Sequence, residues 1–182
     1  MEGDTTCDVM GNPMSLLFYD NFKYITNLPS DYIYAFTSLF SNCTTIVNAK
    51  KLSLCSQQLT KYCYKSMFQG CTSLVNAPKL PATTLTGSCY FSMFRGCTSL
   101  VNAPELPATT LAEGCYSNMF RNCTSLNNVT MLATNISASG CLNYWLDGVS
   151  STGTFTKHPS MTSLPRDASG IPANWTVVDY AG

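Results

Sequence analysis

Cysteine is the residue whose chemistry the sequence suggests first. The chain of 182 residues contains ten cysteines and a single histidine, His158. Cysteines in pairs can form disulfides, cysteines with histidines can bind zinc, and a cysteine beside a histidine can act as a nucleophile. Eight of the ten fall in two columns of nearly constant spacing, namely Cys63, Cys89, Cys115 and Cys141, and Cys43, Cys71, Cys97 and Cys123.

The spacing of these columns favours buried thiols. The sequence has no Cys-x-x-Cys pair, and one histidine serves a tetrahedral zinc site poorly. Residues eight apart on a helix are separated by about 12 Å, which exceeds the limit of roughly 7 Å between Cα atoms for a disulfide. Free cysteine is among the most buried residue types. We therefore predict reduced, buried columns, with Cys7 and Cys55 as the odd thiols, and we expect no metal and no cofactor.

Catalytic patterns are not evident. A Cys-His nucleophile would require His158 to fold beside one particular cysteine. The sequence contains no glycine-rich phosphate loop and no nucleophile-elbow motif, and its ten carboxylates are scattered. We expect the chain not to be an enzyme, and an enzyme built on a repeat scaffold is the less favoured alternative.

The cysteine columns belong to an internal repeat. Residues 63–88 are repeated almost unchanged at 89–114, a period of 26 residues, with differences at only six positions. A degenerate unit precedes them from Ala35, a fourth begins at Cys115, and a fifth begins at Cys141. Self-similarity at a period of about 20–50 residues is typical of folds built from stacked coils.

Each unit carries a pattern that predicts one short helix and one short strand. Cys89, Met93 and Cys97 lie at i, i+4 and i+8, and Tyr90 and Phe94 lie beside them, as on one face of a helix. The helical spacing makes these aromatic and methionine side chains core residues; a sugar-stacking platform is the alternative, and the tyrosines are its best candidates. Residues 100–103 read as a strand that ends before a proline.

The sequence therefore predicts an α/β fold. We expect a right-handed leucine-rich-repeat solenoid with one short strand and one short helix in each coil of about 26 residues. Residues 35–145 would form the solenoid, 1–34 an N-terminal cap, and 146–182 a C-terminal cap with short strands near 153–157 and 175–178.

The repeated phrase resembles a known family. Met-Phe-x-Gly-Cys-Thr-Ser-Leu-x-x-Ala-Pro-x-Leu-Pro, at 67–81 and 93–107, is similar to the BspA-like, or Treponema-type, leucine-rich repeat. The resemblance covers roughly residues 35–145, although the unit is longer than the usual family repeat. It implies a solenoid of the kind found on surface proteins of gut and oral bacteria and on virions of their phages. Those proteins act in adhesion and recognition.

Composition limits the partners. Charged residues make up 11% of the chain and the net charge is zero, which argues against nucleic acid as a partner. No window of about 18 apolar residues is present, so we expect no membrane insertion. The first residues lack the basic start and apolar run of a secretory signal. The resemblance implies an extracellular protein, on a bacterial cell surface or a virion surface, and the missing signal favours the virion or a fragment of a longer chain.

Four residues are the candidate binding residues. Asn76 and Asn102 recur at the predicted strand position, and Lys79 and Glu105 are equivalent residues that differ between the two near-identical copies. The asparagines could form a polar binding face or a structural ladder that satisfies loop backbone, and the sequence does not decide between these. We expect a non-catalytic adhesion module that binds a surface protein or glycan. The alternative is a phage virion protein, structural or for host attachment, that contacts neighbouring virion proteins.

Overall fold

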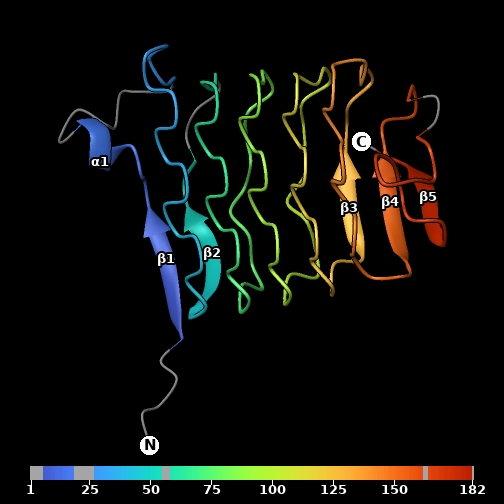
Figure 1. The fold of residues 1–182 in the computed structure, drawn as a ribbon, viewed down its shortest axis with the longest axis horizontal. Helices are drawn as coiled ribbons and strands as arrows, with labels where there is room; N and C mark the ends of the chain where they lie inside the picture. The colour runs from blue at the N-terminus through green and yellow to red at the C-terminus, as the bar shows by residue number, and fades with distance from the viewer. Residues whose placement is uncertain (1–5, 19–26, 55–57, 162–163, 182) are drawn as a thin grey trace, which may run out of the picture.

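The structure is a stack of coils with short parallel strands at its two ends (Figure 1). The computed structural model describes residues 6–18, 27–54, 58–161 and 164–181. Strands β1 (Cys7–Gly11) and β2 (Ile46–Leu52) form one parallel pair. Strands β3 (Asn128–Met131), β4 (Gly153–Lys157) and β5 (Trp175–Asp179) form a three-stranded parallel sheet. The coils between the two sheets are joined by hydrogen bonds and isolated parallel bridges.

The prediction of one strand and one helix per coil is wrong. In the described part of the chain, the only helix is α1 (Ser15–Phe18), which lies outside the repeats. The segments predicted as helices, near 62–71, 88–97 and 114–123, are successive turns; we call them the turn segments. The predicted strand at 100–103 contributes only a single bridge, from Asn102 to Asn128. The described coils therefore lack the alternating strands and helices of the predicted α/β solenoid.

Backbone hydrogen bonds explain why turns replace a helix. In the turn segment 62–71, four amides donate locally to the carbonyl three residues earlier, at 3.1–3.3 Å; they belong to Lys65, Met67, Gln69 and Cys71. The four amides that alternate with them donate to the next coil, at 2.8–3.0 Å; they belong to Tyr64, Ser66, Phe68 and Gly70. This arrangement gives each of these amides a partner and also binds the coils together.

The alternation requires left-handed backbone at every fourth residue. Tyr62, Ser66 and Gly70 have φ of 59°, 55° and 73°, and the next coil repeats this at Ser88, Ser92 and Gly96. A non-glycine residue in this region costs roughly 1–2 kcal/mol. The hydrogen bonds to the neighbouring coil hold the backbone in this conformation, so the turn segments depend on stacking for their stability.

The core is formed by pairs of adjacent buried residues, separated by pairs that contain at least one partly exposed residue. Tyr64, Met67 and Phe68 are buried, as are their equivalents in the next two coils, Tyr90, Met93, Phe94, Tyr116, Met119 and Phe120. The rings stack from coil to coil, with centroids 5.7 Å apart for Phe68 and Phe94. The core interpretation of the aromatic and methionine residues is therefore confirmed, and the buried tyrosines cannot form a sugar-stacking platform.

The C-terminal part closes one end of the stack with two tryptophans. Trp145 Nε1 donates to the Gly170 carbonyl at 2.7 Å, and Trp175 Nε1 donates to the Ser150 carbonyl at 2.8 Å. The strands expected near 153–157 and 175–178 are observed as β4 and β5. At the other end, β1 and α1 lie on the outside of the first coil (Figure 1).

Candidate functional site

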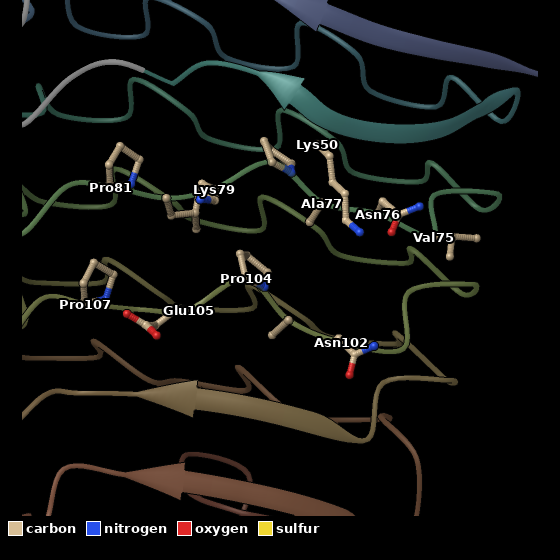
Figure 2. Close-up of a pocket in the computed structure, with 13 residues that line it drawn as sticks. Lys50, Val75, Asn76, Ala77, Lys79, Pro81, Asn102, Pro104, Glu105 and Pro107 are labelled. Carbon is tan, nitrogen blue, oxygen red and sulfur yellow. The ribbon is translucent and has the colours of Figure 1, made fainter. Parts of the chain in front are cut away.

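The described surface contains a groove of about 780 Å³ between the second and third coils, and all four predicted binding residues line it. One wall is formed by residues 75–81 and the other by residues 102–107, with Lys50 of β2 added from the first coil. Figure 2 shows Asn76 and Asn102 at one end of the groove, Pro81 and Pro107 at the other, and Lys79 and Glu105 between them.

The groove lies where the backbone ladder between coils is interrupted. Ala49 N–H donates to the Asn76 carbonyl at 2.8 Å, and Ala103 N–H donates to the Asn128 carbonyl at 2.9 Å. The equivalent bond from Ala77 to Asn102 is not made, and among the described residues no backbone hydrogen bond joins 76–81 to 102–107. The second and third coils are therefore less closely joined here than their neighbours are.

Proline lines both walls of the groove. Pro78 and Pro81 in one wall are matched by Pro104 and Pro107 in the other, and proline has no amide hydrogen to donate. Towards the fourth coil the ladder resumes: Leu106 N–H donates to the Thr130 carbonyl at 3.0 Å. The fourth coil has lost both prolines of the phrase, so the sequence confines this proline-lined pair of walls to two adjacent coils.

The asparagines at the groove differ from their counterpart in the first coil. Asn48 uses its side chain within the protein, because Oδ1 accepts from Lys50 N–H at 3.1 Å and Nδ2 donates to Asp8 at 3.1 Å. The side chains of Asn76 and Asn102 make no hydrogen bond to any described residue. This difference favours a binding face over a structural amide ladder at these two positions.

Lys79 and Glu105 carry opposite charges in equivalent positions of adjacent coils, and both are exposed. The ion pairs of the described residues are Arg121–Asp147 and Lys157–Asp179, so Lys79 and Glu105 do not pair within 4.0 Å. Lys50 adds a second ammonium group to the same groove. Ammonium groups donate hydrogen bonds, a carboxylate accepts them, and carboxamides do both. Together these groups can bind a ligand that carries donors, acceptors or charged groups of either sign.

The sequence interpretation missed the prolines and Lys50 as lining residues. The sequence held a signal for both. Pro78 and Pro81 recur at Pro104 and Pro107, and aligning Cys43 with Cys71 sets Lys50 level with Pro78, which the bridge from Asn48 to Asn76 also shows. Exposed Val75, whose side chain is 45% exposed, completes the asparagine end of the groove.

The other sequence candidates do not form a reactive site in the described part of the chain. The His158 Nδ1 atom accepts from Ser160 N–H at 3.1 Å. No cluster of three or more metal-ligating side chains is found there. Cys55 lies outside the described residues, and the other nine cysteines are free thiols, most of them buried. None of the described helices is long and apolar enough to cross a membrane.

A second, smaller cavity of about 270 Å³ lies beside the C-terminal segment. Its charged side chains already have partners within the protein. Asp147 pairs with Arg121 at 3.0 Å, and Arg166 donates to the carbonyls of Pro172 and Trp175 at 2.9 Å. These groups hold the end of the stack together, so the larger groove is the better candidate for a binding site.

Comparisons with known proteins found no relative of this chain. No family model, no curated protein and no solved structure matches the chain.

Proposed function

We propose that the chain is a non-catalytic recognition module that binds a protein or glycan on a bacterial surface through the groove between its second and third coils. The observation that carries the proposal is the convergence of Asn76, Asn102, Lys79 and Glu105 on one groove of about 780 Å³. The resemblance of the repeated phrase to adhesion repeats supports an extracellular setting, on a cell or a virion.

The chemistry of the walls indicates how such a ligand is held. Carboxamides both donate and accept hydrogen bonds, so Asn76 and Asn102 suit amide or hydroxyl groups. The rings of the four prolines offer apolar surface between them. The two ammonium groups of Lys50 and Lys79 and the carboxylate of Glu105 leave a small net charge, so binding should weaken only modestly when salt screens the charges.

The test compares two triple variants that change composition and charge equally. Asn76→Ala/Asn102→Ala/Lys79→Glu alters the groove, and it sets a second carboxylate beside Glu105. Asn127→Ala/Asn174→Ala/Lys61→Glu alters exposed residues outside the groove. The groove variant should bind intact gut-bacterial cells, or their isolated surface proteins or glycans, about tenfold more weakly or worse, equivalent to ~1.4 kcal/mol. The control should bind like the wild-type protein.

The result that would overturn the proposal is a groove variant that stays folded and binds unchanged. A purified chain that turns over a substrate, with activity abolished by His158→Ala, would instead overturn the non-catalytic assignment.

A further inference from the structure

The stack has two open edges, one at each end, and they face in opposite directions. Strand β1 pairs only with β2, and β5 pairs only with β4, among the described residues. Figure 1 shows β1 and β5 as the outermost strands of the stack. A strand at the edge of a sheet presents a row of unpaired amide and carbonyl groups, which is a template for another strand.

The direction of the strands allows one edge to continue the other. The pairings β1–β2, β3–β4 and β4–β5 are all parallel, as are the isolated bridges between coils. Tyr180 N–H donates to the Lys157 carbonyl of β4 at 2.7 Å. Amides alternate in direction along a strand, so those of Val177 and Asp179 point away from β4, toward the open edge.

The two edges also match in the faces that they present. Val9 of β1 and Val177 of β5 are partly buried against the core, and each belongs to the alternating inward face of its strand. A row of polar residues runs along the outer face, because Asp8 pairs with Asn48 at one end and Thr154 pairs with Thr176 at the other. Continuing this row sets Asp8 of one copy beside Thr176 of the next.

This register brings compatible side chains together. Val9 meets Val177 on the inner face, and Met10 meets Val178 on the outer face, where they are now 62% and 39% exposed. The Thr176 hydroxyl can donate to the Asp8 carboxylate. Asp179, which pairs with Lys157, falls opposite Gly11, so no two carboxylates face each other. A shift by one residue would set the outward Met10 beside the inward Val177, so the faces of the two strands would no longer match, which disfavours other registers.

Neither edge strand contains lysine or proline, two residues that commonly protect edge strands against pairing. Strand β1 has irregular register against β2 between Cys7 and Asp8 and between Asp8 and Met10. The first unit also carries other exposed apolar side chains, including Leu16 at 66% and Ile33 at 52%. Exposed apolar residues gathered at one end are typical of an association surface.

We propose that the protein associates head to tail with a second copy of itself, by parallel addition of β1 of one copy to β5 of the next. The two surfaces differ, so the interface is heterologous and can repeat along a row of copies. The groove lies on the middle coils, away from both edges, so this association is independent of ligand binding.

Sedimentation velocity of the purified full chain, over a wide range of concentrations, tests the proposal. The weight-average mass should rise with concentration above the 19.8 kDa of one copy. Met10→Lys and Val178→Lys should each prevent this rise, because lysine on an edge strand opposes pairing. Val75→Lys, at a residue of similar exposure within the groove, should leave association unchanged.

Mixing the two edge variants gives the sharpest outcome. The Met10→Lys variant keeps an intact β5 and the Val178→Lys variant keeps an intact β1, so the mixture should form dimers and nothing larger. If lysine unfolds either strand by circular dichroism, Asp8→Lys and Thr176→Lys replace the pair. A wild-type chain that stays monomeric at all concentrations, or a mixture with no dimer, would overturn head-to-tail association.

Discussion

At the scale of single residues, the cysteine columns show how a reactive side chain becomes a core group. Cys71, Cys97 and Cys123 donate from Sγ to carbonyls of the preceding coil, at 3.0, 3.1 and 2.9 Å. Burial raises the pKa of Cys63 and of Cys123 to about 12. Thiols that remain protonated are poor nucleophiles and poor metal ligands, so the columns are structural.

The nine described cysteines are free thiols, as predicted. The helical spacing that was the basis of the prediction is wrong, however. The helix that would have separated them by its rise does not exist. Neighbours in a column lie in adjacent coils, roughly 4.8 Å apart by the spacing of a sheet ladder. Alkylation in denaturant without reductant should label at least eight thiols, and native alkylation should label exposed Cys7 first. Two or more disulfides among the column residues would contradict this.

Alkaline pH should destabilise the fold through the same thiols. The folded pKa of Cys63, Cys71, Cys115 and Cys123 is raised by burial to about 12, against 9.0 for an ordinary thiol. Above pH 9 the unfolded state loses these protons while the folded state keeps them. The free energy of unfolding should therefore fall from pH 9 towards pH 12, by about 1.4 kcal/mol per pH unit for each thiol.

Urea unfolding at pH 7.5, 9.0 and 10.0 measures this effect. The stability should already be lower at pH 9.0 than at pH 7.5, because about half of the unfolded thiols are ionised at their pKa of 9.0, and it should drop more steeply towards pH 10.0. A Cys63→Ala variant, less stable throughout because of its cavity, should show a shallower slope. Equal slopes for the variant and the wild-type protein would mean that other groups cause the loss.

Glycines in the turn segments allow a second test at this scale. Gly70 and Gly96 have φ of +73° and +75°, but a Cβ on Gly70 would collide with Asn42 Oδ1, whereas a Cβ on Gly96 would meet nothing closer than 3.9 Å. Gly96→Ala should therefore cost about 1–2 kcal/mol from backbone strain alone, and Gly70→Ala should cost more.

Gly87→Ala is the matched control, because Gly87 lies outside the left-handed region and its nearest neighbour is the flexible Lys61 side chain at 3.4 Å. This change should be neutral or stabilising by up to about 1 kcal/mol. Thermal melts of the three variants give the order. Equal losses at all three glycines would show that the turn geometry has been misassigned.

At the scale of elements, each turn segment is stable only as part of a stack. Its left-handed residues are unfavourable by themselves, and half of its amides donate to the next coil. The rings of Phe40, Phe68, Phe94 and Phe120 form a continuous column, with centroids 5.2–5.7 Å apart. These contacts between coils take the place of the local contacts that would stabilise an isolated helix.

Phe94→Ala tests the aromatic column at its centre. Phe94 is fully buried between the rings of two neighbouring coils, so the change should cost about 3–5 kcal/mol. Gln69, an outward residue of the turn segment, is the control, and Gln69→Ala should change stability by no more than roughly 0.5 kcal/mol. If both variants shifted the urea midpoint by similar amounts, the assignment of Phe94 to the inward face and Gln69 to the outward face would be wrong.

At the scale of the whole molecule, nearly all regular structure is parallel strand and turn. The far-ultraviolet circular dichroism spectrum of the chain should therefore lack the paired minima of helix. The four residues of α1 are too few to produce them. A strongly helical spectrum would contradict the turn segments and restore the strand-and-helix coil.

The edge strands at the two ends of the stack determine whether copies of the molecule can associate. If copies associate head to tail, the arrangement suits a protein that is displayed in multiple copies, as on a virion. A chain that remains monomeric suits an adhesion module carried by a cell. The sedimentation experiment therefore also bears on which of the two proposed settings, a virion or a cell surface, is the better proposal.

The sequence by itself determined the register of the coils and the inward residues. The 26-residue period aligned equivalent positions, and burial of Tyr64, Met67 and Phe68 followed from their apolar spacing. It also selected four residues that share one groove, the recurring Asn76 and Asn102 and the varying pair Lys79 and Glu105, because equivalent positions of adjacent coils lie side by side.

Only the tertiary structure decided the conformation of the turn segments. Pairs of inward residues recur every four positions, and over nine residues this period is close to the 3.6 of a helix. The pattern therefore fits both conformations. What distinguishes them is the bond from Phe68 N–H to the Met93 carbonyl, and others like it. These bonds exist only once the next coil is stacked, so no local pattern could reveal them. The gap between residues 76–81 and 102–107 likewise depends on two neighbouring coils, because the missing hydrogen bond would have its donor in one coil and its acceptor in the next.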